Sequence, residues 1–241
     1  MILITRPVSQ TKNLELLLSS NNFAYALFPA FEIIKLKTKA PTKKYDVIIF
    51  ISINAVNYAE RHFGELFTDS SKVFAVGPVT ANQLFKKNIS VDCFPKINAS
   101  SQELLKMKEC SELSDKQILI VRGKGGSETL KKHLNSSNQV DYLEVYERSP
   151  CNLTELHRES IESFLKEPDG VLMLTSKESL YNVVRLVNSI SSEYFEILRS
   201  KKTIVFSQRI KSGAKSMGFE NIVITQNPSD EDFVSILLNK K

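Results

Sequence analysis

The sequence ILITR at residues 2–6 returns, with one change, as ILIVR at residues 118–122. Each stretch is followed by a segment with the periodicity of a helix. In both segments two leucines stand four residues apart, on one helical face; they are Leu14 and Leu18 in the first copy and Leu130 and Leu134 in the second. This repetition predicts that the chain holds two diverged copies of one strand-and-helix unit.

A second correspondence lies further along each copy. Residues 85–94 align without a gap on residues 215–224, which places Asn88 opposite Gly218. Asn and Gly are the residues that best tolerate the left-handed backbone conformation that ends many helices. We therefore expect the same helix C-cap in both copies.

Apolar runs predict ten short strands in two sets of five, with helices at matching places between them. Uninterrupted runs such as VIIFI and VLML are typical of strands in parallel sheets that are covered on both faces. Each copy is therefore expected to be a flavodoxin-like, doubly wound α/β sheet. The predicted strands are residues 2–5, 25–34, 47–51, 73–76 and 91–94, and then 118–121, 140–146, 171–175, 203–206 and 221–224.

Two stretches have the composition of linkers, LKTKAPTKK (36–44) and SPCNLT (149–154), and each follows the second strand of a copy. Linkers at equivalent points predict interleaved domains. One domain would comprise residues 1–35 and 150–241, from both chain ends, and the other would be an insertion of residues 45–147. The two adjacent crossings would form a two-strand hinge beside a cleft.

The composition is that of a globular protein: 42% of the 241 residues are hydrophobic and 24% are charged. No apolar run is long enough to span a bilayer, and the N-terminus does not resemble a signal peptide, so a soluble, cytoplasmic protein is expected. A net charge of +5 suits an acidic small molecule. The basic residues are scattered, which argues against nucleic acid as a partner. Nothing in the sequence requires more than a monomer.

Cysteines and histidines give no sign of a metal site or of a disulfide framework. The three cysteines show no CxxC spacing, and the three histidines stand alone. All six are expected to be structural or surface residues; they are Cys93, Cys110, Cys151, His62, His133 and His157.

Candidate binding residues follow from the rule that open α/β sheets bind ligands beyond the carboxyl ends of their strands. There, helix N-termini offer free N–H groups. Hydroxyls, small residues and arginines occupy these positions, with no carboxylate among them, so the loops are expected to bind anionic groups. The candidates are Thr5, Arg6, Ser52, Asn54, Gly77, Thr80, Arg122, Gly123, Ser176 and Ser207.

Each candidate also has a structural explanation. Ser52, Thr80, Ser176 and Ser207 could be helix caps, and the two arginines could be solvated or paired with carboxylates. The run RGKGGSE (122–128) is not a good nucleotide loop, since Glu128 stands where the dinucleotide fingerprint needs its third glycine. Tyr146 ends a strand beside the second crossing, so its hydroxyl could face the cleft, or it could be an ordinary strand tyrosine.

Seven segments in register resemble the uroporphyrinogen-III synthase family: ILITRP (2–7), FISINAV (50–56), AVGPVTANQL (75–84), ILIVRGKGG (118–126), VYER (145–148), LTS (174–176) and SQRIKSGAKSMGF (207–219). Two departures stand out. Ser127 replaces an arginine that is usual in the family, with Lys124 as a possible substitute for its anion contact. FIS at 50–52 replaces the usual FTS.

The resemblance implies two similar α/β domains and an enzyme without cofactor or metal. It implies a lyase whose substrate is hydroxymethylbilane, a linear tetrapyrrole with eight carboxylates. The reaction removes its hydroxyl and closes the ring with inversion of ring D, in porphyrin (haem) biosynthesis. Tyr146 matches the family's proposed acid, and the ten candidates above become substrate-binding positions. The upstream hydroxymethylbilane synthase becomes a possible transient partner.

Two other functions are compatible with parts of the sequence. A non-catalytic, two-lobed protein for a small anion would share the hinged architecture but form no product. A nucleotide-dependent transferase would need phosphate-loop glycines that the sequence lacks.

Overall fold

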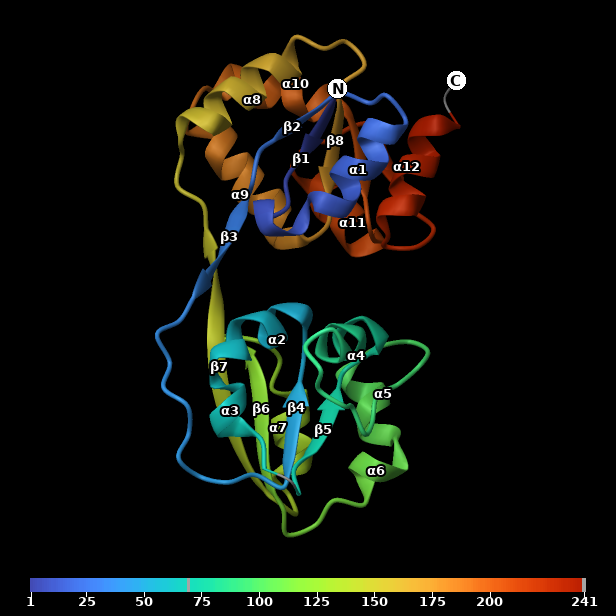
Figure 1. Cartoon of the computed structure of the whole chain (residues 1–241). Coiled ribbons are helices and arrows are strands. Elements are labelled where there is room, and N and C mark those ends of the chain that lie inside the picture. The colour runs from blue at the N-terminus through green and yellow to red at the C-terminus, as the bar shows by residue number, and fades with distance from the viewer. Residues whose placement is uncertain (69, 240–241) are drawn as a thin grey trace. The chain divides into compact units, whose positions relative to one another are not determined.

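The computed structural model describes residues 1–68 and 70–239, which form two compact units. Unit 1 comprises Met1–Ile33 and Ser149–Lys241, and unit 2 comprises Ile34–Arg148. Each unit is an α/β layer with its own five-stranded sheet (Figure 1). The predicted two-domain α/β fold is therefore confirmed.

The sheet of unit 1 has the order β10-β9-β8-β1-β2, and its neighbouring strands pair in parallel. This is the strand order of flavodoxin-like sheets. Its strands are β1 (Ile2–Ile4), β2 (Tyr25–Leu27), β8 (Val171–Leu174), β9 (Lys202–Val205) and β10 (Ile222–Ile224). Its helices are the 3-10 turn η1 (Val8–Gln10), α1 (Lys12–Ser20), α8 (Glu155–Leu165), α9 (Lys177–Asn188), α10 (Ser192–Ser200), α11 (Gln208–Ser216) and α12 (Asp230–Leu238).

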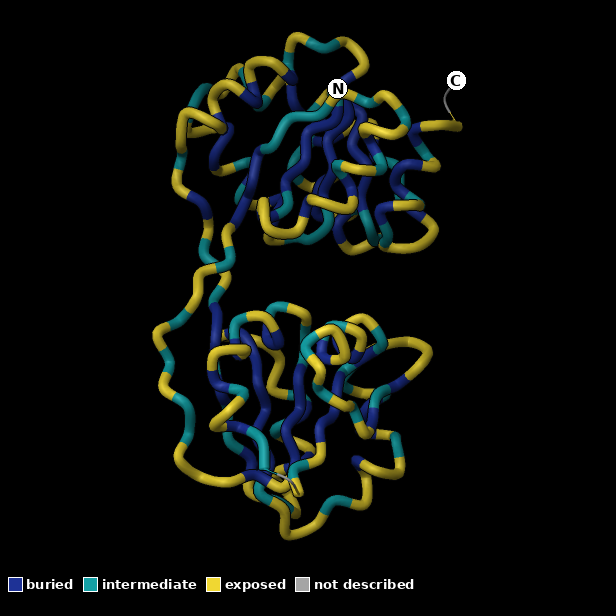
Figure 2. The backbone as a smooth tube through the Cα atoms, viewed as in Figure 1, coloured by how far each residue is buried: buried dark blue, intermediate teal, exposed yellow. Residues whose placement is uncertain are grey.

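Both faces of this sheet are buried under helices. Alternate residues of each strand point to opposite faces, so each strand contributes to two cores. Leu3 and Leu172 join a core that is closed by α8, α9, α10 and α11. Ile4 and Met173 join a second core, against α1 and α12. The predicted helix leucines Leu14 and Leu18 are fully buried in that second core. Figure 2 shows the strands as the buried centre of the unit.

The sheet of unit 2 has the order β3-β7-β6-β4-β5. Strands β7, β6, β4 and β5 pair in parallel and correspond to β2, β1, β8 and β9 of unit 1. The strands are β3 (Phe31–Lys35), β4 (Val47–Phe50), β5 (Lys72–Ala75), β6 (Gln117–Gly123) and β7 (Gln139–Pro150). The helices are α2 (Ile53–Ala59), the 3-10 turn η2 (Glu60–His62), α3 (Phe63–Leu66), α4 (Pro78–Phe85), α5 (Ser101–Lys106), α6 (Lys108–Ser111) and α7 (Thr129–Leu134).

Three expected strand boundaries were wrong. The run 25–34 is divided into β2 and β3, because Pro29 between them has no N–H to donate to a ladder. The run 91–94 gives a single bridge, Phe74 to Cys93, since the Asp92 carboxylate accepts the Val73 N–H at 2.7 Å. Strand β7 continues to Pro150, into the segment expected to be a linker.

The chain passes from one unit to the other twice, within two strands that are neighbours in the sheet of unit 2. The first boundary lies inside β3, after Ile33, and the second lies inside β7, after Arg148. Among the described residues no helix is long and apolar enough to cross a membrane.

The repeated C-cap is present in both units. Asn88 follows α4 with φ of 58°, and Gly218 follows α11 with φ of 86°. In each case this residue's N–H donates to the carbonyl three residues back at 3.0 Å. The next N–H donates five residues back, at 3.0 Å after α4 and 3.1 Å after α11. This hydrogen-bond pattern is the Schellman motif.

The left-handed conformation at position 88 predicts how variants at this position rank in stability. Asn88→Gly should equal or exceed the parent, whereas Asn88→Ala should be about 1–2 kcal/mol less stable than Asn88→Gly, because a Cβ is disfavoured at positive φ. Urea unfolding followed by circular dichroism measures the difference. Gly64→Ala is the control, since a Cβ at Gly64 meets open space and its φ is not left-handed. Equal stability of the two Asn88 variants would contradict the cap's role.

Candidate functional site

A tyrosine and a serine meet at the carboxyl edge of the sheet in unit 2. Tyr146, on β7, places its hydroxyl oxygen 3.1 Å from the hydroxyl oxygen of Ser52, which follows β4. Ser52 is also the N-cap of α2, and its Oγ accepts the N–H of Ala55 at 3.1 Å. The end of β4 and the start of α2 thereby fix the direction of the tyrosine hydroxyl.

The tyrosine can reach this serine because a glycine lies between them. In the sheet order β6 separates β7 from β4, so the ring of Tyr146 has to cross the end of β6. That end is Gly123, where a Cβ would lie 2.5 Å from ring carbons of Tyr146. The ring of Tyr58, on α2, lies 5.8 Å away between centroids. Tyr146 is held in this position with 6% of its surface exposed.

A β-bulge sets which residue of β7 lies beside Gly123. Arg122 pairs with Glu144, but the register then shifts, so that Gly123 pairs with Tyr146 and not with Val145. Bulges re-aim side chains in this way and are frequent beside active sites. The shift brings the tyrosine over the only residue type that leaves room for its ring.

Arg122 itself is buried, with 1% of its surface exposed. Its Nη1 donates to Glu128 Oε1 at 2.9 Å, and its Nε donates to the carbonyl of Gly123 at 3.1 Å. Its guanidinium lies over the ring of Tyr142, 4.3 Å from the centroid. Glu128, which lies two residues beyond the candidate loop positions 122–126, folds back onto the arginine.

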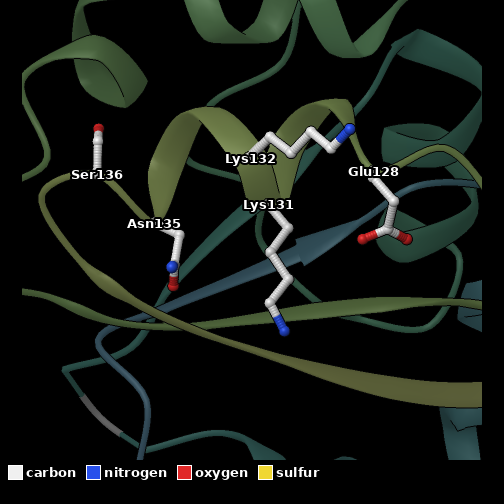
Figure 3. A pocket seen from close by; sticks show the side chains of 5 residues that line it. All are labelled: Glu128, Lys131, Lys132, Asn135 and Ser136. Carbon is white, nitrogen blue, oxygen red and sulfur yellow. The ribbon is translucent and has the colours of Figure 1, made fainter.

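Glu128 lies at the beginning of α7, beside an open pocket of about 430 Å³. Figure 3 shows Glu128 among the residues that line this pocket, with Lys131 and Lys132 projecting from α7. Hydrogen bonds from Tyr142 and from Arg122 lower the pKa of the Glu128 carboxyl, so it is ionised at neutral pH. Burial and the bond to Glu128 raise the pKa of Tyr142 to about 12.

The remaining candidates of unit 2 belong to two helix N-termini. Asn54 is the second residue of α2 and is half-buried. Gly77 is the N-cap of α4, where a Cβ would lie 2.2 Å from Ala99 Cβ. No side chain caps this helix, so its first-turn N–H groups suit an anion. Thr80 is not a cap; it lies buried within α4.

In unit 1 the candidates lie at the equivalent edge, after β1, β8 and β9. Ser176 and Ser207 are the N-caps of α9 and α11, and each accepts a backbone N–H, at 3.0 and 3.4 Å. Thr5 is fully buried, and its hydroxyl donates to the carbonyl of Met173 at 2.7 Å. Arg6 pairs with Asp230 at 2.6 Å and lies over the ring of Phe206, at 5.3 Å.

These two edges can bind anions and move a proton. Helix N-termini supply N–H donors, and the Tyr146 hydroxyl, 3.1 Å from that of Ser52, is a group that could donate a proton. Among the described residues there is no cluster of three histidine, cysteine or carboxylate side chains placed to hold a metal. The three cysteines are buried free thiols.

Comparison with known proteins places the chain in a family. The family model for uroporphyrinogen-III synthase HemD matches residues 13–235. The chain belongs to the uroporphyrinogen-III synthase family. The resemblance to this family is thereby confirmed.

Relatives within the family match over most of their length. The uroporphyrinogen-III synthase of Salmonella typhimurium is 26% identical over 98% of this chain and 99% of that protein. The Escherichia coli K12 enzyme is 24% identical over 80% of this chain and 78% of its own length.

Two solved structures share the fold. The Helicobacter pylori uroporphyrinogen-III synthetase has a TM-score of 0.63 at 17% identity, covering 90% of this chain and 93% of that one. A mutant uroporphyrinogen III synthase from Thermus thermophilus has a TM-score of 0.56 at 15% identity, covering all of both chains.

Several residues at these edges were not predicted from the sequence. Asp230 follows β10, so the rule of strand carboxyl ends would have found it if the fifth strand had been included. Tyr58 carries no sequence signal beyond its place on α2. Glu128 and Tyr142 also lacked a signal, because their contacts with Arg122 depend on how the loop after β6 folds back. The structure does bring together Tyr146, Ser52 and Gly123, which come from three predicted segments.

The contact between the two hydroxyls can be measured by a double-mutant cycle in stability. Ser52→Ala should cost about 1 kcal/mol through the lost cap. Combined with Tyr146→Phe, it should show a coupling of about 0.5–1.5 kcal/mol for the shared hydrogen bond. Ser176→Ala, which removes a similar cap from α9, should be additive with Tyr146→Phe. Additivity of the Ser52 pair in urea unfolding would mean that the bond is not formed.

Proposed function

We propose that this chain catalyses the synthase reaction of its family, the dehydration and cyclisation of hydroxymethylbilane to uroporphyrinogen III with inversion of ring D. The family match over residues 13–235 and relatives of that name support the reaction class. The single structural observation that carries the proposal is the position of the Tyr146 hydroxyl. It is held 3.1 Å from Ser52 at the carboxyl edge of a parallel sheet.

The proposed acid is Tyr146. The Oγ of Ser52 accepts the N–H of Ala55, so its own proton is free to point at the tyrosine oxygen. In that arrangement the phenol proton is available to the leaving hydroxyl of the substrate, which departs as water. The shielded ring of Tyr146 limits competition from bulk water for this proton.

The rest of the reaction depends on position. The pyrrole nitrogen lone pair drives the hydroxyl out, and the substituted carbon of ring D attacks to give a spiro intermediate. That intermediate fragments and recloses with ring D inverted, and the proton lost on final ring closure replaces the one given by Tyr146. One water is released overall. The enzyme has to orient the linear tetrapyrrole so that this carbon attacks. A rigid surface that binds the substrate's carboxylates is suited to that task.

The substrate's carboxylates would bind at helix N-termini and cap hydroxyls. In unit 2 the proposed positions are Ser52, Asn54, Gly77 and Thr80, with the backbone N–H groups of α4 as the main donors. In unit 1 they are Ser176 and Ser207, and Arg6 would bind a substrate carboxylate only in exchange for its present partner Asp230. Thr5 and Arg122 are too buried to touch a ligand in this structure, and Gly123 lies beneath the ring of Tyr146, so the proposed contribution of all three is indirect.

The wider setting also stays a prediction. The resemblance implies a reaction without cofactor or metal, a cytoplasmic location, and a transient contact with the hydroxymethylbilane synthase that makes the unstable substrate.

An isomer assay tests the proposed reaction. Hydroxymethylbilane is generated in the cuvette, the protein is added, and the products are oxidised and separated as uroporphyrin isomers. We expect the type III isomer in proportion to protein. A protein that only binds an anion would leave the uncatalysed type I isomer alone, and that result would refute the synthase proposal.

Tyr146→Phe tests the proposed acid. General-acid help is worth about 10²- to 10⁴-fold in rate, and this substrate already loses its hydroxyl easily, so we expect a fall in kcat near the lower end of that range. Initial rates of type III formation give kcat and KM. Gly64→Ala serves as the unaffected control. Turnover of Tyr146→Phe at the parent rate would remove Tyr146 from the acid role.

A further inference from the structure

Arg122 is the most deeply buried charged side chain among the described residues of unit 2, and no step of the proposed chemistry touches it. Arg122 is 1% exposed, and its Nη2 has no hydrogen-bond partner among the described residues. A buried guanidinium is costly to maintain unless it is paired and hydrogen-bonded. Its other two guanidinium nitrogens both donate hydrogen bonds: Nη1 donates to Glu128, and Nε donates to the Gly123 carbonyl, beside Tyr146.

The peptide between Gly123 and Lys124 is held at both ends. Its carbonyl accepts the Arg122 Nε at 3.1 Å, and its N–H donates to the carbonyl of Tyr146 at 2.8 Å. This peptide follows directly after the bulge that pairs Gly123 with Tyr146. The arginine therefore fixes the peptide that fixes the backbone of the tyrosine.

The arginine is in turn fixed by three side chains. Glu128 Oε1 accepts from Nη1 at 2.9 Å, and Glu128 Oε2 accepts the Tyr142 hydroxyl at 2.8 Å. The ring of Tyr142 supports the guanidinium from one side, and Lys131 lies 4.5 Å from the same ring. Glu144 approaches Nε at 4.0 Å.

The loop after β6 closes over this group. A Cβ at Gly126 would lie 2.7 Å from Arg122 Nη2, so the loop backbone passes directly over the guanidinium. The side chain of Glu128 is 50% exposed and that of Glu144 is 36% exposed, so solvent reaches both carboxylates of this group. A ligand carboxylate could reach Arg122 only after this loop and Glu128 moved away.

We propose that Arg122 is a positioning residue for Tyr146, acting through the Gly123–Lys124 peptide, and that it does not contact the substrate. The proposal rests on the proposed synthase function. Glu128 and Tyr142 hold Arg122 in the orientation in which its Nε meets the Gly123 carbonyl. Loss of that bond frees the bulge, and the Tyr146 hydroxyl is then less often directed by Ser52.

The test is a double-mutant cycle in turnover with Arg122→Met and Tyr146→Phe. If Arg122 acts through Tyr146, Arg122→Met should lower kcat about tenfold or more and leave KM within about twofold. It should have little further effect in the Tyr146→Phe background. Multiplicative effects, or a rise in KM that depends on salt, would overturn the proposal in favour of a general structural role or a substrate contact.

Two matched controls accompany the cycle. Lys132→Met removes one positive charge from the exposed face of α7 and should retain the parent kcat and KM. Gly126→Ala pushes on the guanidinium without removing its charge, and it should reproduce the fall in kcat if Arg122→Met fails to fold. Gly64→Ala, where the added Cβ meets open space, should keep the parent kcat. Parent kcat in Gly126→Ala would also count against the proposal.

The parent protein separates this inference from the proposed function. If the parent forms no type III isomer, the synthase proposal fails. The positioning role is then judged by the same cycle in thermal unfolding, which needs no turnover. Non-additive melting temperatures for Arg122→Met and Tyr146→Phe would support it, and additive ones would refute it.

Discussion

Parallel pairing of the strands is the constraint on which both units depend. It places the carboxyl ends of all strands, and the N-termini of the helices that follow, along one edge of each sheet. Side chains far apart in the sequence then meet without any long connection. Ser52 and Tyr146 are 94 residues apart, yet their hydroxyl oxygens lie 3.1 Å apart because β4 and β7 end on either side of β6.

The same constraint explains why small residues and a bulge are needed there. A tyrosine that crosses a neighbouring strand needs a residue without a side chain beneath its ring, and Gly123 is that residue. A regular ladder would set Val145 beside it, so the register has to shift by one. The glycine, the bulge and the tyrosine act together. All three are needed to place the Tyr146 hydroxyl beside Ser52.

Much of this fold could be predicted from local sequence, because its signals are local. Strand ends, serine caps at 52, 176 and 207, and the left-handed residues at 88 and 218 are each set by a few neighbouring residues. The repeat then relates them to one another. The interruption at Pro29 was also readable from its missing N–H. The weak fifth strand was not, since an aspartate side chain there replaces a backbone acceptor.

The arginines show where such reasoning stops. Arg6 and Arg122 occupy the same repeat position, and free arginines at strand ends would suit an anionic ligand. Each is instead paired with a carboxylate, Asp230 at 2.6 Å and Glu128 at 2.9 Å, which comes from a segment whose path the sequence does not specify. The repeat preserves the arginine, while the two carboxylates come from different places in the two units. A conserved position in a duplicated fold therefore identifies where a cation stands, but the loop around it decides whether that cation binds a ligand or holds the backbone.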